Sequence, residues 1–359
     1  MEFENKVIGL KNIKSVYFIQ KIFKHLDKVK SLLIVNYNKK LQNLLKFNFN
    51  DYKDYSELFS PIEIELTIAK DKHGQFINIE NDNYFHVYFN DNKQEQKKDK
   101  IDENEKVNKI KVIIDYQINS LNALFKNCEC IESIIIKKFY RNNIINMKDM
   151  FYKCLSLKEV DFISANTINV TDMYAMLYEC VLLNKINLSK FNTHNVKNMS
   201  YMFYKCSSLK ELNINNFDTI NVIDMRIMFC KCTSLRKLNI SNFNTINLIR
   251  MNTTFGECSS LEELDLSNFN TMNLTDIGGL FYECTSLKKV NLSNFNTEKV
   301  YNMRNMFYGC KSLKELIFPN FKVNDDTITL DMFKGCSNEL KEELMKQNCF
   351  KIYEDKIFK

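Results

Sequence analysis

The apolar and polar positions of this chain form a unit that repeats every 26 residues. Within one unit, Leu209, Leu212 and Ile214 follow the spacing LxxLxL, and the alternation at its end predicts a short strand with one buried face. Further along, Val222–Phe229 places apolar groups three, six and seven residues apart, which predicts one or two turns of helix with a single buried stripe. Each unit is therefore expected to run as strand, turn, short helix and turn.

Cysteine marks the period most clearly, because nine cysteines occupy the same position of the unit. They are Cys128, Cys154, Cys180, Cys206, Cys232, Cys258, Cys284, Cys310 and Cys336. An aliphatic residue three positions after each Cys from 128 to 310, and Phe eleven positions after the later ones, share the period. A single unit cannot bury its own apolar face, so we expect the units to stack as coils, with parallel strands about 4.8 Å apart.

Two consecutive units carry a family resemblance. They read CSSLEELDLSNFNTMNLTDIGGLFYEC (258–284) and CTSLKKVNLSNFNTEKVYNMRNMFYGC (284–310). Both resemble the BspA-like leucine-rich repeat family, whose signature is NMxxMFxxCxSLxxLdLSxFdT. The resemblance covers about 128–336 and implies an α/β fold: a leucine-rich-repeat-type solenoid of 26-residue coils, each a parallel strand plus a short helix, with a small N-terminal helical or mixed domain. The units 128–153 and 311–336 depart from the signature, as is typical of capping units.

The cysteine column has two interpretations. Cysteine is small and apolar enough for the interior of a stack, and without an evident signal peptide the thiols are expected to be reduced. The alternative is metal binding, prompted by the pairs Cys128/Cys130 and Cys230/Cys232, although no histidine stands beside them. We favour the interior interpretation and expect no metal and no cofactor. The asparagine column that includes Asn195 is expected to hydrogen-bond the backbone of turns.

The exposed strand positions predict the candidate binding face. Five residues after each Cys the charge alternates along Glu159, Lys185, Glu211, Lys237, Glu263, Lys289 and Glu315. Two residues later come Asp161, Asn187, Asn213, Asn239, Asp265 and Asn291. Opposite charges on neighbouring strands contribute about 0.2–1 kcal/mol per pair, so the ladder can act simply to set the register of the coils. The alternative is a polar, nearly neutral face for a protein ligand, since such a face suits phosphate backbones poorly and no nucleic acid is expected.

The first 60 residues share none of the repeated positions, and their apolar spacing predicts two or three short amphipathic helices. The segment resembles the F-box, with the pattern IxxIFxxLdxxxLLxxxxxNKxxxxLL. The resemblance implies docking on a Skp-type adaptor of a ubiquitin ligase through Ile19, Ile22, Phe23, Leu26, Leu32 and Leu33. The usual Leu-Pro start and the Trp near the end of the motif have no counterpart, and a generic small helical domain is the alternative.

The sequence divides into five predicted segments. Residues 1–60 form the F-box-like domain, and 61–90, rich in β-branched and aromatic residues, a small β element. The stretch 91–108 has almost no apolar residues and predicts a flexible charged linker. The solenoid with its N-terminal cap occupies 109–336, and 337–359 forms the C-terminal cap.

Composition disfavours an enzyme. Among 359 residues there are 7 Gly and 4 His, with no GxGxxG, GxxxxGK[ST] or HExxH motif. A thiol or metal enzyme built on Cys230 and Cys232 would lack a neighbouring His or carboxylate cluster in the sequence. No stretch reaches the roughly 18 apolar residues of a membrane helix, and the N-terminus has no apolar signal-peptide core. We expect a cytoplasmic protein, or alternatively one that reaches the cell surface without a signal peptide.

Two functions remain after these exclusions. The first is non-enzymatic protein–protein recognition by the solenoid, as the substrate-reading half of an intracellular F-box-type receptor. The second, implied by the BspA-like resemblance, is a surface protein or adhesin that binds host or neighbouring-cell proteins. Both require a protein ligand on the solenoid face, and the first adds a Skp-type adaptor at the N-terminus.

Overall fold

The structure is a computed structural model of the 359-residue chain, and it divides into two compact units, Met1–Ser60 and Pro61–Lys359. The residues that it describes are 16–24, 26, 31, 34, 39–46, 56, 59–79 and 85–358. Each unit is described by itself.

The described part of the first unit contains two helices, α2 (Val16–Lys24) and α4 (Lys39–Leu45). Ile19 and Phe23 lie four residues apart on one face of α2, a spacing that places both side chains on the same stripe. They pack with Leu41 of α4 into a small buried cluster.

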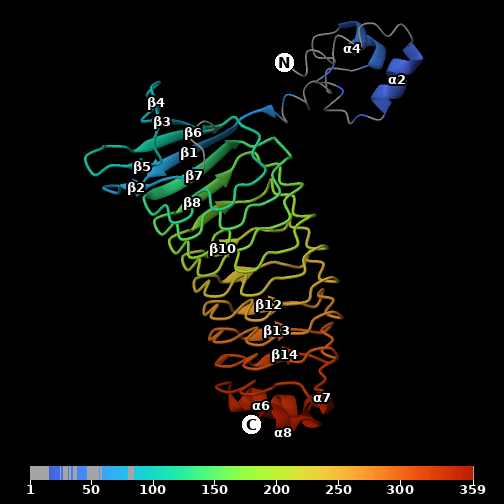
Figure 1. Ribbon diagram of the computed structural model, residues 1–359. Helices are drawn as coiled ribbons and strands as arrows, with labels where there is room; N and C mark the ends of the chain where they lie inside the picture. Colours follow the sequence, from blue (N-terminus) through green and yellow to red (C-terminus); the bar gives the residue numbers. More distant parts are fainter. Residues whose placement is uncertain are drawn as a thin grey trace. The chain divides into compact units, whose positions relative to one another are not determined.

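The second unit is a β-solenoid, which confirms the predicted stacking of 26-residue coils (Figure 1). One short strand per coil stacks in parallel register, so that Glu159 lies beside Lys185 and Glu263 beside Lys289. The strands are β7 (Ile131–Lys138), β8 (Glu159–Phe162), β9 (Lys185–Asn187), β10 (Glu211–Leu212), β11 (Lys237–Leu238), β12 (Glu263–Asp265), β13 (Lys289–Asn291) and β14 (Glu315–Ile317). A second parallel ladder of single bridges runs along the return side of the coils, from Ser120 to Ile328.

The return half of each coil is not helical, so the predicted short helix is wrong. Across 119–336 this half consists of successive turns. The N–H of Met225 donates to the carbonyl of Arg250 in the next coil (3.0 Å), whereas the N–H of Met228 donates back to Met225 (3.2 Å). Left-handed residues, Ile227 (φ 61°) and Lys231 (φ 64°), recur four residues apart. In an α-helix, each of these N–H groups would donate to the carbonyl four residues earlier. The apolar spacing of the return half therefore belongs to a stack of turns.

An antiparallel sheet closes the N-terminal end of the solenoid. Its strands are β1 (Ile62–Ile68), β3 (Phe85–Phe89), β4 (Glu95–Gln96) and β6 (Lys109–Ile114), and β2 (Gly74–Gln75) and β5 (Lys100–Ile101) form a separate two-stranded antiparallel sheet. β1 pairs with β6 on one side and with β7 on the other, which joins this sheet to the parallel strands in the order β4-β3-β6-β1-β7-β8-β9. Arg141 is buried in the first coil, where its guanidinium donates to the carbonyl of Ile114 (2.7 Å).

Three short helices close the C-terminal end: α6 (Asn338–Met345), α7 (Asn348–Lys351) and α8 (Glu354–Ile357). The Ser337 hydroxyl caps α6 by accepting the N–H of Leu340 (3.2 Å). The Phe350 ring stacks on Phe321 of the last coil with centroids 4.6 Å apart, so the helices cover the apolar end of the stack. The two caps bury the ends of the solenoid, where open strand edges would otherwise invite further pairing.

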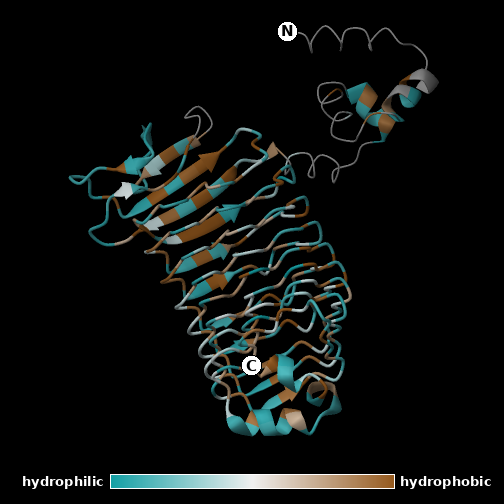
Figure 2. Cartoon of the chain, turned by 60° about the horizontal axis from the view of Figure 1, so that its bottom comes forward, coloured by the Kyte–Doolittle hydropathy of each residue, from teal (hydrophilic) through white to brown (hydrophobic). Residues whose placement is uncertain are grey.

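The core is built from columns of apolar side chains, one from each coil, and most coils have the same residue at a given position; in the Phe column, Leu177 replaces Phe in one coil. Brown apolar positions alternate with teal polar ones along the strands in Figure 2, as expected for strands with one buried face. Phe229, Phe255 and Phe281 stack with ring centroids 5.7–5.8 Å apart. Because each ring lies between two equivalents, the interior is one continuous column rather than a set of separate cores.

Candidate functional site

The strand face places the predicted binding residues in two neighbouring rows. Glu211 of β10 is the register partner of Lys237 of β11, and Asp265 of β12 is that of Asn291 of β13. Side chains at these positions are exposed or half-buried, while the residue between the two rows is buried, as Leu212 and Leu264 are. The predicted residues therefore lie in two rows over the strands of successive coils, which pair as β7-β8-β9, β10-β11 and β12-β13-β14.

Near both ends of the solenoid, neighbouring residues of the alternating charged row form ion pairs with each other. Lys185 donates to Glu159 in the preceding coil, and the ammonium of Lys289 lies 2.8 Å from the carboxylate of Glu315. The hydrogen bond to Glu315 raises the pKa of Lys289, with a further contribution from the charge of Glu263. At these ends the charges are satisfied within the molecule, in agreement with a role in coil register.

The middle of the ladder differs. Glu211, Lys237 and Glu263 are all exposed, yet within the described residues none of them forms an ion pair. Their alternation thus leaves three unpaired charges side by side in three successive coils. Charged groups without an internal partner are the ones that can be complemented by another molecule.

The polar row two residues further on shapes the turns that follow the strands. The Oδ1 atoms of Asn239 and Asp265 accept the backbone N–H two residues later (3.1 and 2.9 Å), which is an Asx turn. Asn187 also donates to Asp161 in the preceding coil (2.8 Å). Asn213 and Asn291 make the same local bond as Asn239. Residues of this row therefore have a structural task in addition to their exposure.

A third row, of charged residues four positions after seven of the nine column cysteines, was missed at the sequence level. It contains Glu132, Lys158, Lys210, Arg236, Glu262, Lys288 and Lys314. Lys158 pairs with Glu132, and Lys288 with Glu262, each at 2.6 Å. Lys210 and Arg236 are exposed beside the unpaired charges of the middle coils. The 26-residue period was the available signal for this row.

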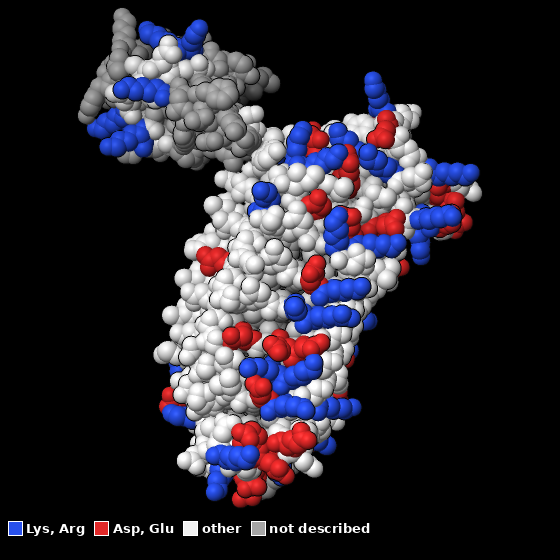
Figure 3. Space-filling model, turned by 180° about the vertical axis from the view of Figure 1, so that it is seen from behind, with Lys and Arg blue, Asp and Glu red and all other residues white. Residues whose placement is uncertain are grey.

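Figure 3 shows charged side chains gathered along one side of the solenoid, beside a largely uncharged surface.

The cysteine column lies in the interior, as predicted. Each thiol from Cys154 onward donates to a backbone carbonyl of the preceding coil, for example Cys258 to Phe229 and Cys232 to Phe203, both at 3.1 Å. Burial raises the pKa of the Cys180 thiol to about 12, which keeps it protonated as a donor. All twelve cysteines are free thiols, and the described residues contain no group of three or more metal-ligating side chains.

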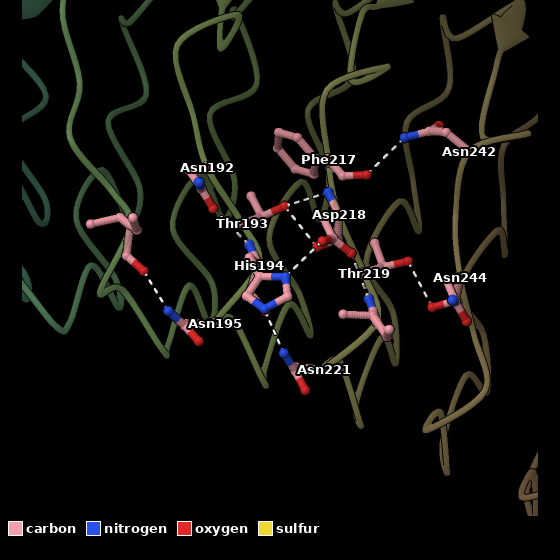
Figure 4. Close-up of polar contacts among 12 residues, drawn as sticks. Asn192, Thr193, His194, Asn195, Phe217, Asp218, Thr219, Asn221, Asn242 and Asn244 are labelled. Carbon is pink, nitrogen blue, oxygen red and sulfur yellow. Dashed lines mark hydrogen bonds and ion pairs between the residues drawn. The ribbon is translucent and has the colours of Figure 1, made fainter.

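Asparagine and threonine columns join the coils at the corner that follows the strand (Figure 4). The side-chain amide of Asn221 donates to the backbone carbonyl of His194 in the preceding coil (2.7 Å). The buried hydroxyl of Thr219 donates to the backbone carbonyl of Asn244 in the next coil (2.9 Å). Asn195 bonds Ile168 in the same way (2.7 Å), which confirms the predicted role of its column.

The F-box-like residues fall partly within the described part of the first unit. Ile19 and Phe23 are buried, and Leu26 is half-buried against the same cluster. A hollow of about 470 Å³ lies beside them, lined by Gln20, Phe23, Lys24, Leu26, Ser31, Leu44, Leu45 and Lys46. Leu32, Leu33 and the side chain of Ile22 lie outside the described residues.

The fold and these columns define a tandem-repeat β-solenoid protein with capped ends. The chain matches the family described as "Mycoplasma protein of unknown function, DUF285" over residues 119–237 and 206–319. These ranges cover more than half of the chain, and the protein belongs to this family. No curated protein and no solved structure matches it. Among the described residues, no helix has the length and apolar character needed to span a membrane.

Proposed function

We propose that the solenoid is a non-enzymatic recognition module that binds a protein ligand on its strand face. The observation that carries the proposal is the set of unpaired charges of Glu211, Lys237 and Glu263 in the middle coils. Equivalent charges at the ends pair with each other, so register alone does not require the middle ones to remain open. A mixed, nearly neutral set of charges favours a protein surface of matching pattern over a polyanion.

Photo-crosslinking tests this proposal directly. A photoreactive residue at Lys237 is expected to capture one protein ligand in cells, because Lys237 lies at the centre of the open charges. The matched control carries the same residue at Lys299, an exposed position on the corner side of the coil. Absence of any specific adduct at 237, or the same adducts at both positions, would refute recognition by the strand face.

The first version of this function is the F-box-type substrate receptor. It is supported by the hollow lined by the apolar side chains of Phe23 and Leu26 together with the lysines Lys24 and Lys46. We expect a Skp-type adaptor to be retained by the full-length protein and lost in the K24E/K46E variant. Reversal of the exposed lysines at the start of α4, K39E/K40E, is the control that should retain it. An adaptor that is never recovered, or is recovered equally with K24E/K46E, would exclude this version.

The alternative version is a BspA-like surface protein or adhesin, supported by the resemblance of the repeat units to that family. Protease treatment of intact cells separates the two versions, because only a surface protein is accessible. Removal of the protein while a cytoplasmic marker persists would support the adhesin. Full protection of the protein would support the cytoplasmic receptor.

A further inference from the structure

An asparagine-lined groove lies at the corner of the last coils, apart from the charged strand positions. Its volume is about 440 Å³. The lining residues are Asn268, Phe269, Asn270, Met272, Asn294, Asn296, Asn320 and Lys322. Five of the eight are asparagines, contributed by three successive coils, and Lys322 is the one charged residue among them.

The first row of amides presents acceptors. Asn268 and Asn320 donate their Nδ2 groups to carbonyls of the preceding coil, Phe243 and Ser293, both at 3.0 Å. Asn294 makes the equivalent bond to the carbonyl of Ser267. All three side chains are exposed, and no described residue donates to their Oδ1 atoms. One end of each amide is therefore fixed, and the carbonyl oxygen is left for a ligand.

The second row, two residues further along, presents donors. Here the Oδ1 atoms are committed, since Asn270 accepts the N–H of Met272 (3.2 Å) and Asn296 that of Glu298 (2.8 Å). Within the described part of the chain, neither Nδ2 group donates to any atom. The groove thus carries a row of acceptors beside a row of donors, and the rows repeat once per coil, about every 4.8 Å.

This pattern selects among ligand classes. Lys322 is the one charged residue that lines the groove, and a single positive charge is too few to bind a polyphosphate or an acidic polymer. An extended peptide repeats its groups on one side every second residue, about 6.6–6.8 Å, and would fall out of step with the coils. Hydroxyl groups both donate and accept, so they match both rows. In an extended β-1,4-linked glycan successive sugars are turned over, so equivalent hydroxyl groups on one edge recur every second sugar, close to two coil spacings. The exposed Met272 offers an apolar contact for a sugar ring.

We propose that this groove binds a neutral, extended β-1,4-linked polysaccharide that runs along the solenoid axis. Successive sugars would place hydroxyl groups against Asn268, Asn294 and Asn320 on one side and against Asn270 and Asn296 on the other. The site adds a second type of ligand to a module whose protein ligand is bound elsewhere, and it does not depend on the strand face.

Calorimetric titration of the full-length protein with cellohexaose and xylohexaose tests the proposal, with the coiled α-linked maltohexaose for comparison. We expect at least one β-linked hexaose to bind and maltohexaose to bind at least tenfold more weakly. The variant N270D/N296D keeps the turn acceptors and removes the two free donors. Its fold is expected to persist, because Asp218 occupies this column naturally and accepts the N–H of Ile220 (3.1 Å).

The double variant should lose affinity at least tenfold, whereas N192D, in the same column but outside the groove, should bind like the parent protein. Thermal unfolding of each variant confirms that the fold is retained. Failure of both β-linked hexaoses to bind, equal binding of maltohexaose, or unchanged affinity of N270D/N296D would overturn the proposal.

Discussion

In most coils, a cysteine, a threonine and an asparagine side chain satisfy backbone carbonyl groups of a neighbouring coil. The thiol of Cys258, the hydroxyl of Thr219 and the amide of Asn221 each donate to a backbone carbonyl of a neighbouring coil. A buried polar group without a partner costs about 1–3 kcal/mol, so these columns hold the coils in register. At the scale of the residue, the repeated Cys, Thr and Asn positions supply hydrogen-bond donors between coils.

The thiols give a direct test of this role. Cys349 lies outside the column and is half-buried, whereas the column from Cys128 to Cys310 is buried. Burial also raises the pKa of these thiols, and the thiolate is the reactive form. We expect iodoacetamide to modify Cys349 first, Cys336 next and the rest only after denaturation, as measured by peptide mass spectrometry. Modification of Cys258 in the native protein as fast as Cys349 would contradict this.

The threonine column predicts a loss of stability that depends on one hydroxyl. Thr219→Val keeps the shape of the side chain but leaves the carbonyl of Asn244 without its donor. The free energy of unfolding should fall by about 1–3 kcal/mol in urea titrations. Thr219→Ser restores the hydroxyl and should recover most of the loss. If Val and Ser are equally stable, the hydrogen bond has no role in stacking.

At the scale of the element, the strand half of each coil could be predicted and the return half could not. The end of LxxLxL, Leu212–Ile214, alternates with a period of two, which matches a strand with one buried face. The spacing in Val222–Phe229 matches a helix, but it equally suits turns whose amides bond to the next coil. Hydrogen bonds between coils decide whether this segment forms a helix or turns, and the sequence of a single unit does not show those hydrogen bonds. Likewise, the alternating charges could be predicted, but not that Glu211, Lys237 and Glu263 would be unpaired.

The antiparallel cap contains a titratable contact. His86 of β3 lies between Asp115, at 2.9 Å, and Glu95 of β4, at 3.1 Å, and Lys97 also pairs with Glu95. The hydrogen bond to Asp115 raises the pKa of His86 above 6.5, against partial burial, which lowers it. A raised folded-state pKa gives stability that is fully present below pH 6.5 and lost as the pH rises through the folded-state value.

We therefore expect the amides of β3 and β4 to exchange with solvent more readily at pH 8 than at pH 6, after correction for intrinsic rates. His86→Gln removes the titrating group, so its protection should not change with pH in this way. The amides of β12 and β13 are the internal reference. A cap whose protection rises from pH 6 to pH 8 would show that the histidine contact is not stabilising.

At the scale of the whole molecule, the solenoid unit is a capped stack with its open charges in the middle. Antiparallel strands cover one end, α6 to α8 cover the other, and the charge ladder is closed by ion pairs towards both. Under the proposed function, the three unpaired charges are where a protein ligand would gain most from complementary charge.

The most direct measurement is the affinity of the crosslinked protein ligand, once identified, for the parent solenoid and two neutralised variants. E211Q/K237Q/E263Q removes the open charges, and E159Q/K185Q removes a pair that is already satisfied internally. We expect the first variant to bind at least tenfold more weakly and the second to bind within about twofold of the parent, which corresponds to at least about 1.4 kcal/mol for the first. Equal affinity of the first variant and the parent protein would contradict recognition through the strand face.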